Sequence, residues 1–267
     1  MGGGAAQLSD LAVDVVGRVG VLTLDRPHAR NALSRSLLEA LPGAVRALDD
    51  DDAVDVIVLT GRDPAFCAGL DLKELGSAGE GQALLRAGDM GADTLSALPP
   101  VSKPVIGAVN GAAVTGGLEL ALACDFLVAS EQARFADTHA RVGVLPAWGL
   151  TVLLPQAVGL RRAREMSYSG RFVDARTALE WGLVNHVVPH DRLLPFCLEL
   201  AADIATSDRR GVRTMRRTYA DGSLRTAGEA WALERDVAAA WLDDEGGVPG
   251  DMEARQAELR RRSRDAR

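Results

Sequence analysis

Short runs of β-branched and apolar residues alternate with longer amphipathic segments over most of the chain. Two such runs within 13–24 are separated by a Gly-Arg pair, a pattern typical of a β-hairpin. Apolar residues then recur at helical spacing as far as Leu48, and Ser34 stands where an N-terminal helix cap is expected. The largely apolar run 54–60 predicts a buried strand. The chain is therefore expected to begin with strands followed by one amphipathic helix.

The same alternation continues beyond this first part of the chain. Further strands are expected at 104–109, 125–130 and 184–188, and helices at 82–98, 118–123, 150–158, 161–169 and 175–181. Strands that alternate with helices are typical of α/β layering with crossover connections. Only helical patterns follow residue 191, at 193–205, 210–220, 227–242 and 252–262. We therefore predict a flexible N-terminus over 1–10, an α/β core over 11–190 and a helical region over 191–267.

Composition and charge narrow the class of protein. Of the 267 residues, 47% are hydrophobic and 25% are charged, which is ordinary for a globular chain and excludes a disordered one. The net charge of −7 argues against a general attraction to nucleic acid or to an anionic membrane. Cys67, Cys124 and Cys197 lie far apart, and an odd, unpatterned set favours a reducing compartment. Since the sequence shows no signal peptide and no run of about 20 apolar residues, we expect a cytoplasmic protein without a membrane partner.

Two glycine-containing segments are the candidates for a binding site. In 65–74 the chain passes through small residues, which let a backbone approach a ligand closely. In 110–119, Gly116 and Gly117 open a predicted helix, whose free N–H groups and positive dipole end favour an anion. Glu119 follows Gly116 by about one helical turn and therefore lies on the same side. On spacing alone, glycine packing and helix-dipole stabilisation remain the favoured explanation.

Other reactive residue types form no recognisable site. Cysteine and histidine show no zinc-binding spacing, and the glycine pair lacks a dinucleotide-binding context, so neither a metal nor a nicotinamide cofactor is expected. Cys67 has apolar neighbours, which disfavour a thiolate, and we expect it to pack rather than react. His28, His186 and His190 are expected to be surface or loop residues.

Five ordered motifs together resemble those of a known family. They are 24–27 (LDRP) with 31–33 (NAL), 65–74 (AFCAGLDLKE), 103–106 (KPVI) with 110–111 (NG), 116–121 (GGLELA) and 124–125 (CD). Their order and spacing resemble the enoyl-CoA hydratase/isomerase (crotonase) superfamily. The similarity extends through 163–170 and 178–188, and so covers nearly the whole chain.

This resemblance implies a fold, an assembly and a substrate class. The fold would be the ClpP/crotonase architecture, an α/β spiral of β-β-α turns with a helical C-terminal trimerisation region. A homotrimer or a dimer of trimers is expected, and the apolar residues Trp231, Leu233, Val237 and Trp241 of the last helices agree with such an interface. Substrates of the family are acyl-CoA thioesters. Coenzyme A is then part of the substrate, and no separate cofactor is expected.

The resemblance also assigns the reacting residues. The two backbone N–H groups that bind the thioester oxygen fall at Leu70 and Gly116, and such preorganised donors stabilise an enolate-like transition state. Glu119 matches the first of two glutamates that activate water in the hydratases, whereas the position of the second is His139, which departs from that pattern. This histidine can supply an acid or a base near neutral pH, or it can simply fill the pocket. Asp137 is an alternative carboxylate, but it points with His139 only if the segment is extended.

Coenzyme A binding is implied for a further set of residues. By resemblance, the adenine and pantetheine lie along Arg26, His28, Ala29, Ala68, Gly69, Asp71, Leu72 and Lys73, with Trp148 in the pocket wall. Trp148 begins a Trp-Gly-Leu segment where the family commonly has Gly-Gly-Thr. Arg26, His28 and Lys73 carry groups that can approach phosphates, although each can equally be a solvated surface residue, which is favoured for His28.

The leading prediction is an enoyl-CoA hydratase in which Glu119 is the principal acid-base residue and His139 modulates it. An enoyl-CoA double-bond isomerase is the alternative within the family, because one carboxylate that moves a proton can suffice for that reaction. A catalytically silent acyl-CoA-binding protein is the alternative from another class. Replacing Glu119 by glutamine separates these alternatives, since it abolishes a reaction in an enzyme and leaves only binding to observe in a silent protein.

Overall fold

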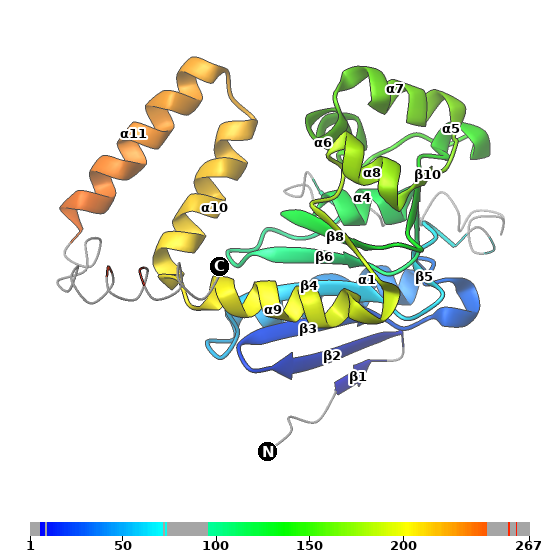
Figure 1. Cartoon of the computed structure of the whole chain (residues 1–267), viewed down its shortest axis with the longest axis horizontal. Helices are drawn as coiled ribbons and strands as arrows, with labels where there is room; N and C mark the ends of the chain where they lie inside the picture. Colours follow the sequence, from blue (N-terminus) through cyan, green and yellow to red (C-terminus); the bar gives the residue numbers. More distant parts are fainter. Residues whose placement is uncertain are drawn as a thin grey trace. The chain divides into compact units, whose positions relative to one another are not determined.

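The computed structural model describes residues 6–8, 10–71, 73, 96–244, 256 and 260. Its contacts divide the chain into two compact units, Met1–Arg209 and Arg210–Arg267. All of the described strands belong to the first unit (Figure 1). Among the described helices, none combines the length and the apolar character that a membrane span requires.

A seven-stranded sheet forms the centre of the first unit (Figure 1). In spatial order its strands are β1 (Ala6–Leu8), β2 (Leu11–Val16), β3 (Val19–Leu24), β4 (Val56–Gly61), β6 (Val105–Val109), β8 (Phe126–Ser130) and β11 (His186–Val188). β1, β2 and β3 pair antiparallel, and every later pairing in this sheet is parallel. The predicted hairpin and the four predicted strands that follow it are confirmed to within two residues at each end.

A second, four-stranded sheet was not predicted. Its strands, in the order β10-β9-β7-β5, are β10 (Val173–Asp174), β9 (Arg134–Ala136), β7 (Ala112–Val114) and β5 (Ala65–Cys67). The sequence analysis predicted no strand in 61–70 or 110–117, because strands of three residues are too short to show an alternating pattern. β4, β6 and β8 of the large sheet lead into β5, β7 and β9 of the small one, so the predicted β-β-α spiral is confirmed.

An apolar core covers each face of the large sheet. Successive side chains of its central strands point alternately into these two cores. On β4, Val56 and Val58 lie in the core that includes Cys197 of α9, whereas Ile57 and Leu59 lie in the larger core with α1 and α4. The helices of the first unit are α1 (Arg35–Asp50), α4 (Gly116–Leu122), α5 (His139–Val142), α6 (Leu150–Val158), α7 (Leu160–Ser169), α8 (Ala175–Trp181) and α9 (Leu193–Ala205).

Most predicted helices of the first unit are confirmed, with one difference in grouping. α1 begins as expected, since the Ser34 hydroxyl accepts the N–H of Leu37 at 3.2 Å. The contacts divide the chain after Arg209, so α9 packs with the first unit although the sequence analysis grouped it with the C-terminal helical region. The predicted helices at 82–98 and 252–262, and most of the predicted N-terminal segment 1–10, fall outside the described residues.

The continuous described part of the second unit, 210–244, contains two helices. They are α10 (Arg209–Ser223), which enters this unit at Arg210, and α11 (Ala227–Asp243), and both were predicted. α11 begins with a capping box in which the Thr226 N–H donates to Glu229 at 3.0 Å. The Arg210 guanidinium lies 5.3 Å from the centre of the Trp241 ring and forms an ion pair with Asp244. Neither helix contains a buried residue.

A buried lysine caps the C-terminal end of α1. The sequence analysis did not predict this contact. Lys103 is fully buried, and its Nζ donates to the carbonyl oxygens of Leu48 at 2.6 Å and Asp51 at 2.7 Å. A cation at this end of a helix also complements the helix dipole. Asp49, near the end of α1, accepts the backbone N–H groups of Ser102 and Lys103 and so holds the segment that leads into β6.

We expect Lys103→Met to lower the free energy of unfolding by about 2 kcal/mol, because two buried carbonyl groups lose their charged donor. Urea unfolding followed by circular dichroism measures this change. Lys73→Met, which alters an exposed lysine, is the matched control and should unfold at the wild-type midpoint. Equal midpoints for the two variants would show that the Lys103 contacts do not stabilise the fold.

Candidate active site

Two backbone segments approach each other closely where β5 and β7 end. Gly69 has a φ of 91°, and a Cβ atom added to it would lie 2.9 Å from the carbonyl oxygen of Val114. A Cβ atom added to Gly117 would lie 2.0 Å from the carbonyl oxygen of Cys67. Since no side chain fits at such a distance, glycine at these positions lets the loop after β5 lie against the start of α4.

This approach leaves two backbone N–H groups unused. Leu33 forms an isolated bridge with Leu70: the Leu33 N–H donates to Gly69 at 2.8 Å, and the Asp71 N–H donates to Leu33 at 3.1 Å. Both bonds use groups that flank the Leu70 N–H. Gly116 is the first residue of α4, where an N–H has no partner within its helix. Among the described residues, neither the Leu70 nor the Gly116 N–H has an acceptor.

Thr115 holds the start of α4 in an unusual backbone conformation. Its φ is 56°, a value that β-branched residues rarely adopt. Its N–H donates to Ala136 at 2.9 Å, and its hydroxyl lies 2.5 Å from that of Thr138. Backbone strain of this kind persists where surrounding contacts fix it, and here it sets the direction of the Gly116 N–H. The sequence pattern carried no signal for this role.

Glu119 lies one turn further along α4, on the side of the free N–H groups, and is only 2% exposed. Its Oε1 accepts the backbone N–H of Trp148 at 2.8 Å, a contact that sequence reasoning could not find. Its Oε2 lies 3.4 Å from the Nε2 of His139. The carboxylate is therefore fixed by one oxygen and faces the histidine with the other.

His139 is the first residue of α5 and is bound on its other side by Asp137. The Nδ1 of His139 lies 2.7 Å from Asp137 Oδ1, which also accepts the backbone N–H of His139 at 3.1 Å. The sequence analysis expected these two side chains to meet only in an extended segment. That expectation is wrong, because β9 ends at Ala136 and a tight turn brings them together.

The two carboxylates determine the charge of His139. Burial by itself lowers the pKa of the imidazole, but hydrogen bonds to Asp137 and Glu119 and the charges of both groups raise it to about 9. For Asp137, burial raises the pKa, and hydrogen bonds from His139 and Ser167 more than offset this and hold it below its usual range. A pKa raised to about 9 favours the protonated form of the His139 ring at neutral pH.

A cavity of about 80 Å³ opens above this group. It is lined by Ala68, Leu70, Thr115, Gly116, Glu119, Thr138, His139, Val142, Val144, Leu145, Ala147 and Trp148. The structure thus brings both predicted N–H donors, both predicted catalytic side chains and Trp148 to one cavity. The apolar residues 142–147 of its wall were not predicted, since nothing in their local pattern distinguishes them from an ordinary loop.

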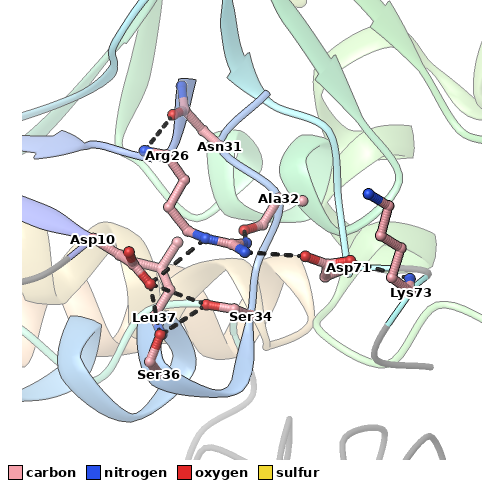
Figure 2. A network of polar contacts seen from close by, with 9 residues as sticks. All are labelled: Asp10, Arg26, Asn31, Ala32, Ser34, Ser36, Leu37, Asp71 and Lys73. Atoms are coloured by element: carbon pink, nitrogen blue, oxygen red, sulfur yellow. Dashed lines mark hydrogen bonds and ion pairs between the residues drawn. The ribbon is translucent and has the colours of Figure 1, made fainter. Parts of the chain in front are cut away.

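Arg26 points towards Asp71, the residue that follows Leu70 in the chain (Figure 2). Its guanidinium donates to Asp71 at 3.1 Å and to the carbonyl oxygen of Ala32 at 2.5 Å, and lies 3.5 Å from Asp10. The side chain is 12% exposed. Asp71 in turn accepts the N–H of Lys73 at 3.1 Å, so Arg26 positions the loop.

The remaining predicted binding residues are less constrained. His28 and Lys73 are exposed, Ala29 lies in a short 3-10 helix (Pro27–Ala29), and Leu72 is outside the described residues.

Cys67 is fully buried, and burial raises the pKa of its thiol to about 12, which agrees with the predicted packing role. Within the described residues, no cluster of three potential ligands could hold a metal ion.

Comparison with known proteins identifies the family. The model of the enoyl-CoA hydratase/isomerase family matches residues 15–258, and the chain belongs to this family. A probable enoyl-CoA hydratase 1, peroxisomal, from Arabidopsis thaliana is 38% identical over 225 residues, which cover 84% of this chain and 83% of the relative. A crotonyl-CoA hydratase from Syntrophomonas wolfei is 33% identical over 244 residues, covering 90% and 94% of the two chains.

Solved structures agree with this assignment. The enoyl-CoA hydratase from Mycobacterium tuberculosis H37Rv is 48% identical, with a TM-score of 0.73 over 86% of this chain and 98% of that chain. The enoyl-CoA hydratase from Bacillus anthracis is 32% identical, with a TM-score of 0.85 over 95% and 97% of the two chains. The architecture is therefore the crotonase fold, as predicted.

We expect the free energy of unfolding to fall by about 2 kcal/mol as the pH rises from about 6.5 to about 9. The sign follows because folding raises the pKa of His139, so the native protein retains over this interval a proton that the unfolded chain releases. His139→Gln should remove this part of the pH dependence, whereas His28→Gln, at an exposed position, should retain it. Denaturant unfolding at several pH values measures this dependence. If the free energy of unfolding changes with pH to the same extent in both variants, the pH dependence does not come from His139.

Proposed function

We propose that this protein is an enoyl-CoA hydratase, which adds water across the α,β double bond of an enoyl-CoA thioester. The observation that carries the proposal is the placement of Glu119 and His139, 3.4 Å apart, in the same cavity as two unpaired backbone N–H groups. The family and the hydratases among its relatives support the same activity.

The two N–H groups bind the thioester oxygen in this proposal. Negative charge develops on that oxygen as the enolate forms, and the Leu70 and Gly116 donors stabilise it without having to reorganise. Their positions are fixed before the substrate arrives, by the Leu33 bridge on one side and the helix start on the other. A single donor of this type typically contributes about 10²- to 10³-fold to the rate.

Glu119 and His139 then divide the proton transfer. The Glu119 carboxylate removes a proton from water as the water oxygen bonds to the β-carbon and the double bond opens. The Nε2–H of the His139 imidazolium protonates the α-carbon of the enolate. The proton taken up by Glu119 passes to the imidazole across the 3.4 Å contact, which restores both groups. Glu119 is the principal group because it activates the nucleophile.

Coenzyme A binding is proposed along the segment 68–73 and the short helix that holds His28 and Ala29. The exposed Lys73 can reach a phosphate, whereas Arg26 acts mainly by holding Asp71 in place. Coenzyme A enters as part of the substrate, so the proposed reaction uses no separate cofactor. A cytoplasmic location remains a prediction from the sequence.

Double-bond isomerisation is the second candidate, and the observation that favours it is that Glu119 is the only glutamate among the described residues that line the cavity. Glu119 can remove a proton from one carbon and return it to another without water, and the nearby imidazolium can stabilise the carboxylate between these steps. The two reactions differ in whether the product gains the atoms of water.

We expect short-chain enoyl-CoAs incubated with the protein in heavy-oxygen water to gain one labelled water, as detected by mass spectrometry. Glu119→Gln should lower this rate by about 10²-fold or more, because the amide can still accept the Trp148 N–H but cannot take up a proton. Glu131→Gln, the same change at an exposed position, is the control. A product with unchanged mass and a moved double bond would identify an isomerase, and binding without turnover would identify a silent acyl-CoA-binding protein.

We also propose that the second unit assembles the protein into a homotrimer or a dimer of trimers. Met215, Tyr219, Trp231 and Leu242 are all more than half exposed on α10 and α11. With Val237 and Trp241 they line or border a groove of about 850 Å³ within this unit. Exposed apolar surface of this kind is typical of a protein interface.

Light scattering is expected to give the mass of three or six chains, and Trp231→Glu is expected to reduce it, because a charge would be buried at the interface. Val16→Glu, which changes an exposed residue of the first unit in the same way, should leave the mass unaltered. A wild-type monomer at micromolar concentration would rule out the assembly.

A further inference from the structure

We propose that Asp137 is a positioning residue for this reaction: it holds His139 protonated, with its Nε2–H directed at Glu119, so that the proton donor is an imidazolium. The inference deepens the proposed hydration and rests on it for its kinetic consequence. Asp137 is not itself placed to touch the substrate, since it is not among the residues that line the cavity.

The geometry fixes the ring through two contacts to one oxygen. Asp137 Oδ1 lies 2.7 Å from Nδ1 of His139 and accepts the backbone N–H of the same residue at 3.1 Å. A ring bound through Nδ1 can present only Nε2 to the cavity, and Nε2 lies 3.4 Å from Glu119 Oε2. The orientation of the His139 ring is therefore set before any ligand binds.

Two carboxylates from different elements supply the charges that act on this ring. Asp137 belongs to the turn between β9 and α5, and Glu119 belongs to α4. α7, which packs against α5, contributes the hydroxyl of Ser167 as a hydrogen-bond partner of Asp137. Arg141, on the same helix as His139, donates instead to the carbonyl oxygen of Ser169 at 3.0 Å. Asp137 is thus oriented from α7 and lies between that helix and the ring.

This arrangement changes the pH dependence of the reaction. A protonated carboxyl serves as an acid only below its own pKa, whereas the pKa of His139, raised to about 9, keeps the ring protonated through neutral pH. Hydration should therefore continue to about pH 9 and decline above it. Without Asp137, the ring would lose one of its two negative neighbours and release its proton at a lower pH.

Nitrogen NMR of histidine-labelled protein tests the charge of the ring directly and without turnover. The chain has four histidines, so His139→Gln identifies the signal of His139 by its loss. We expect both ring nitrogens of His139 to be protonated at pH 7.5 in the wild-type protein. A neutral His139 at this pH would overturn the proposal, even if every Asp137 variant failed to fold.

Asp137→Asn then separates positioning from a merely structural role. Asparagine can still accept a hydrogen bond from Nδ1, so the ring should keep its orientation while its titration midpoint falls by at least about one pH unit. The alkaline limit of kcat should fall by the same amount, giving about a 5-fold loss at pH 9 and little loss at pH 6, with KM nearly unchanged. A uniform loss at every pH, or an unmoved midpoint, would overturn the proposal.

The chain offers a matched control in a second Asp–His pair. Asp63 Oδ2 lies 3.0 Å from His190 Nε2, outside the active site. Asp63→Asn should leave the His139 midpoint and the pH profile as in the wild-type protein. The NMR and kinetic results also distinguish the two proposals. If Asp137→Asn shifts the His139 midpoint but the wild-type protein has no hydratase activity, the role of Asp137 is supported and the proposed function is refuted. If the wild-type protein hydrates enoyl-CoA normally but Asp137→Asn leaves the midpoint unmoved, the function is supported and the role of Asp137 is refuted.

Discussion

The close approach of the loop after β5 to the first turn of α4 is the constraint on which the active site depends. Gly117 lies so near the carbonyl oxygen of Cys67 that a Cβ atom would be only 2.0 Å from it. This contact places the Leu70 and Gly116 N–H groups at one cavity, and the pitch of α4 then brings Glu119 to the same side. A larger residue at position 117 would separate the donors from the carboxylate, even if each segment kept its own secondary structure.

The electrostatic design of the cavity follows from what is buried there. Two buried carboxylates close together would repel each other and raise each other's pKa. His139 lies between Asp137 and Glu119, so one positive charge offsets part of this repulsion, and all three side chains are less than 10% exposed. The resemblance implies a second glutamate at position 139, where this chain has a histidine. This difference alters both the net charge of the two reacting groups, Glu119 and residue 139, and the acid-base chemistry that they can perform.

Contacts made by residues outside the cavity lining hold this arrangement in place. Arg26 connects the loop that carries Leu70 to the N-terminal part of the chain through Asp71 and Asp10. Lys103 closes the end of α1 before the strand that leads to α4. Both are cations whose donors are used within the fold, so the position of Arg26 beside Asp71 does not by itself make it a ligand of the substrate.

Hydrophobic patterning predicted the long elements well and the short ones poorly. β4 and α1 each bury enough side chains to show their period, whereas β5, β7 and β9 have three residues each and are defined by their neighbours in the second sheet. That sheet forms only when successive turns of the spiral stack, so a single segment carries little sign of it.

For the active site, the sequence by itself determined which residues had to meet. The resemblance of the ordered motifs to a known family implied Leu70, Gly116, Glu119 and His139, whereas the helical pattern alone placed only Glu119 on the same side as Gly116. Only the tertiary structure decided the partners: Trp148 binds one oxygen of Glu119, and Asp137 turns His139 towards the other. The physical reason is that the pKa and direction of a buried side chain depend on groups brought close in space, which local sequence spacing does not specify.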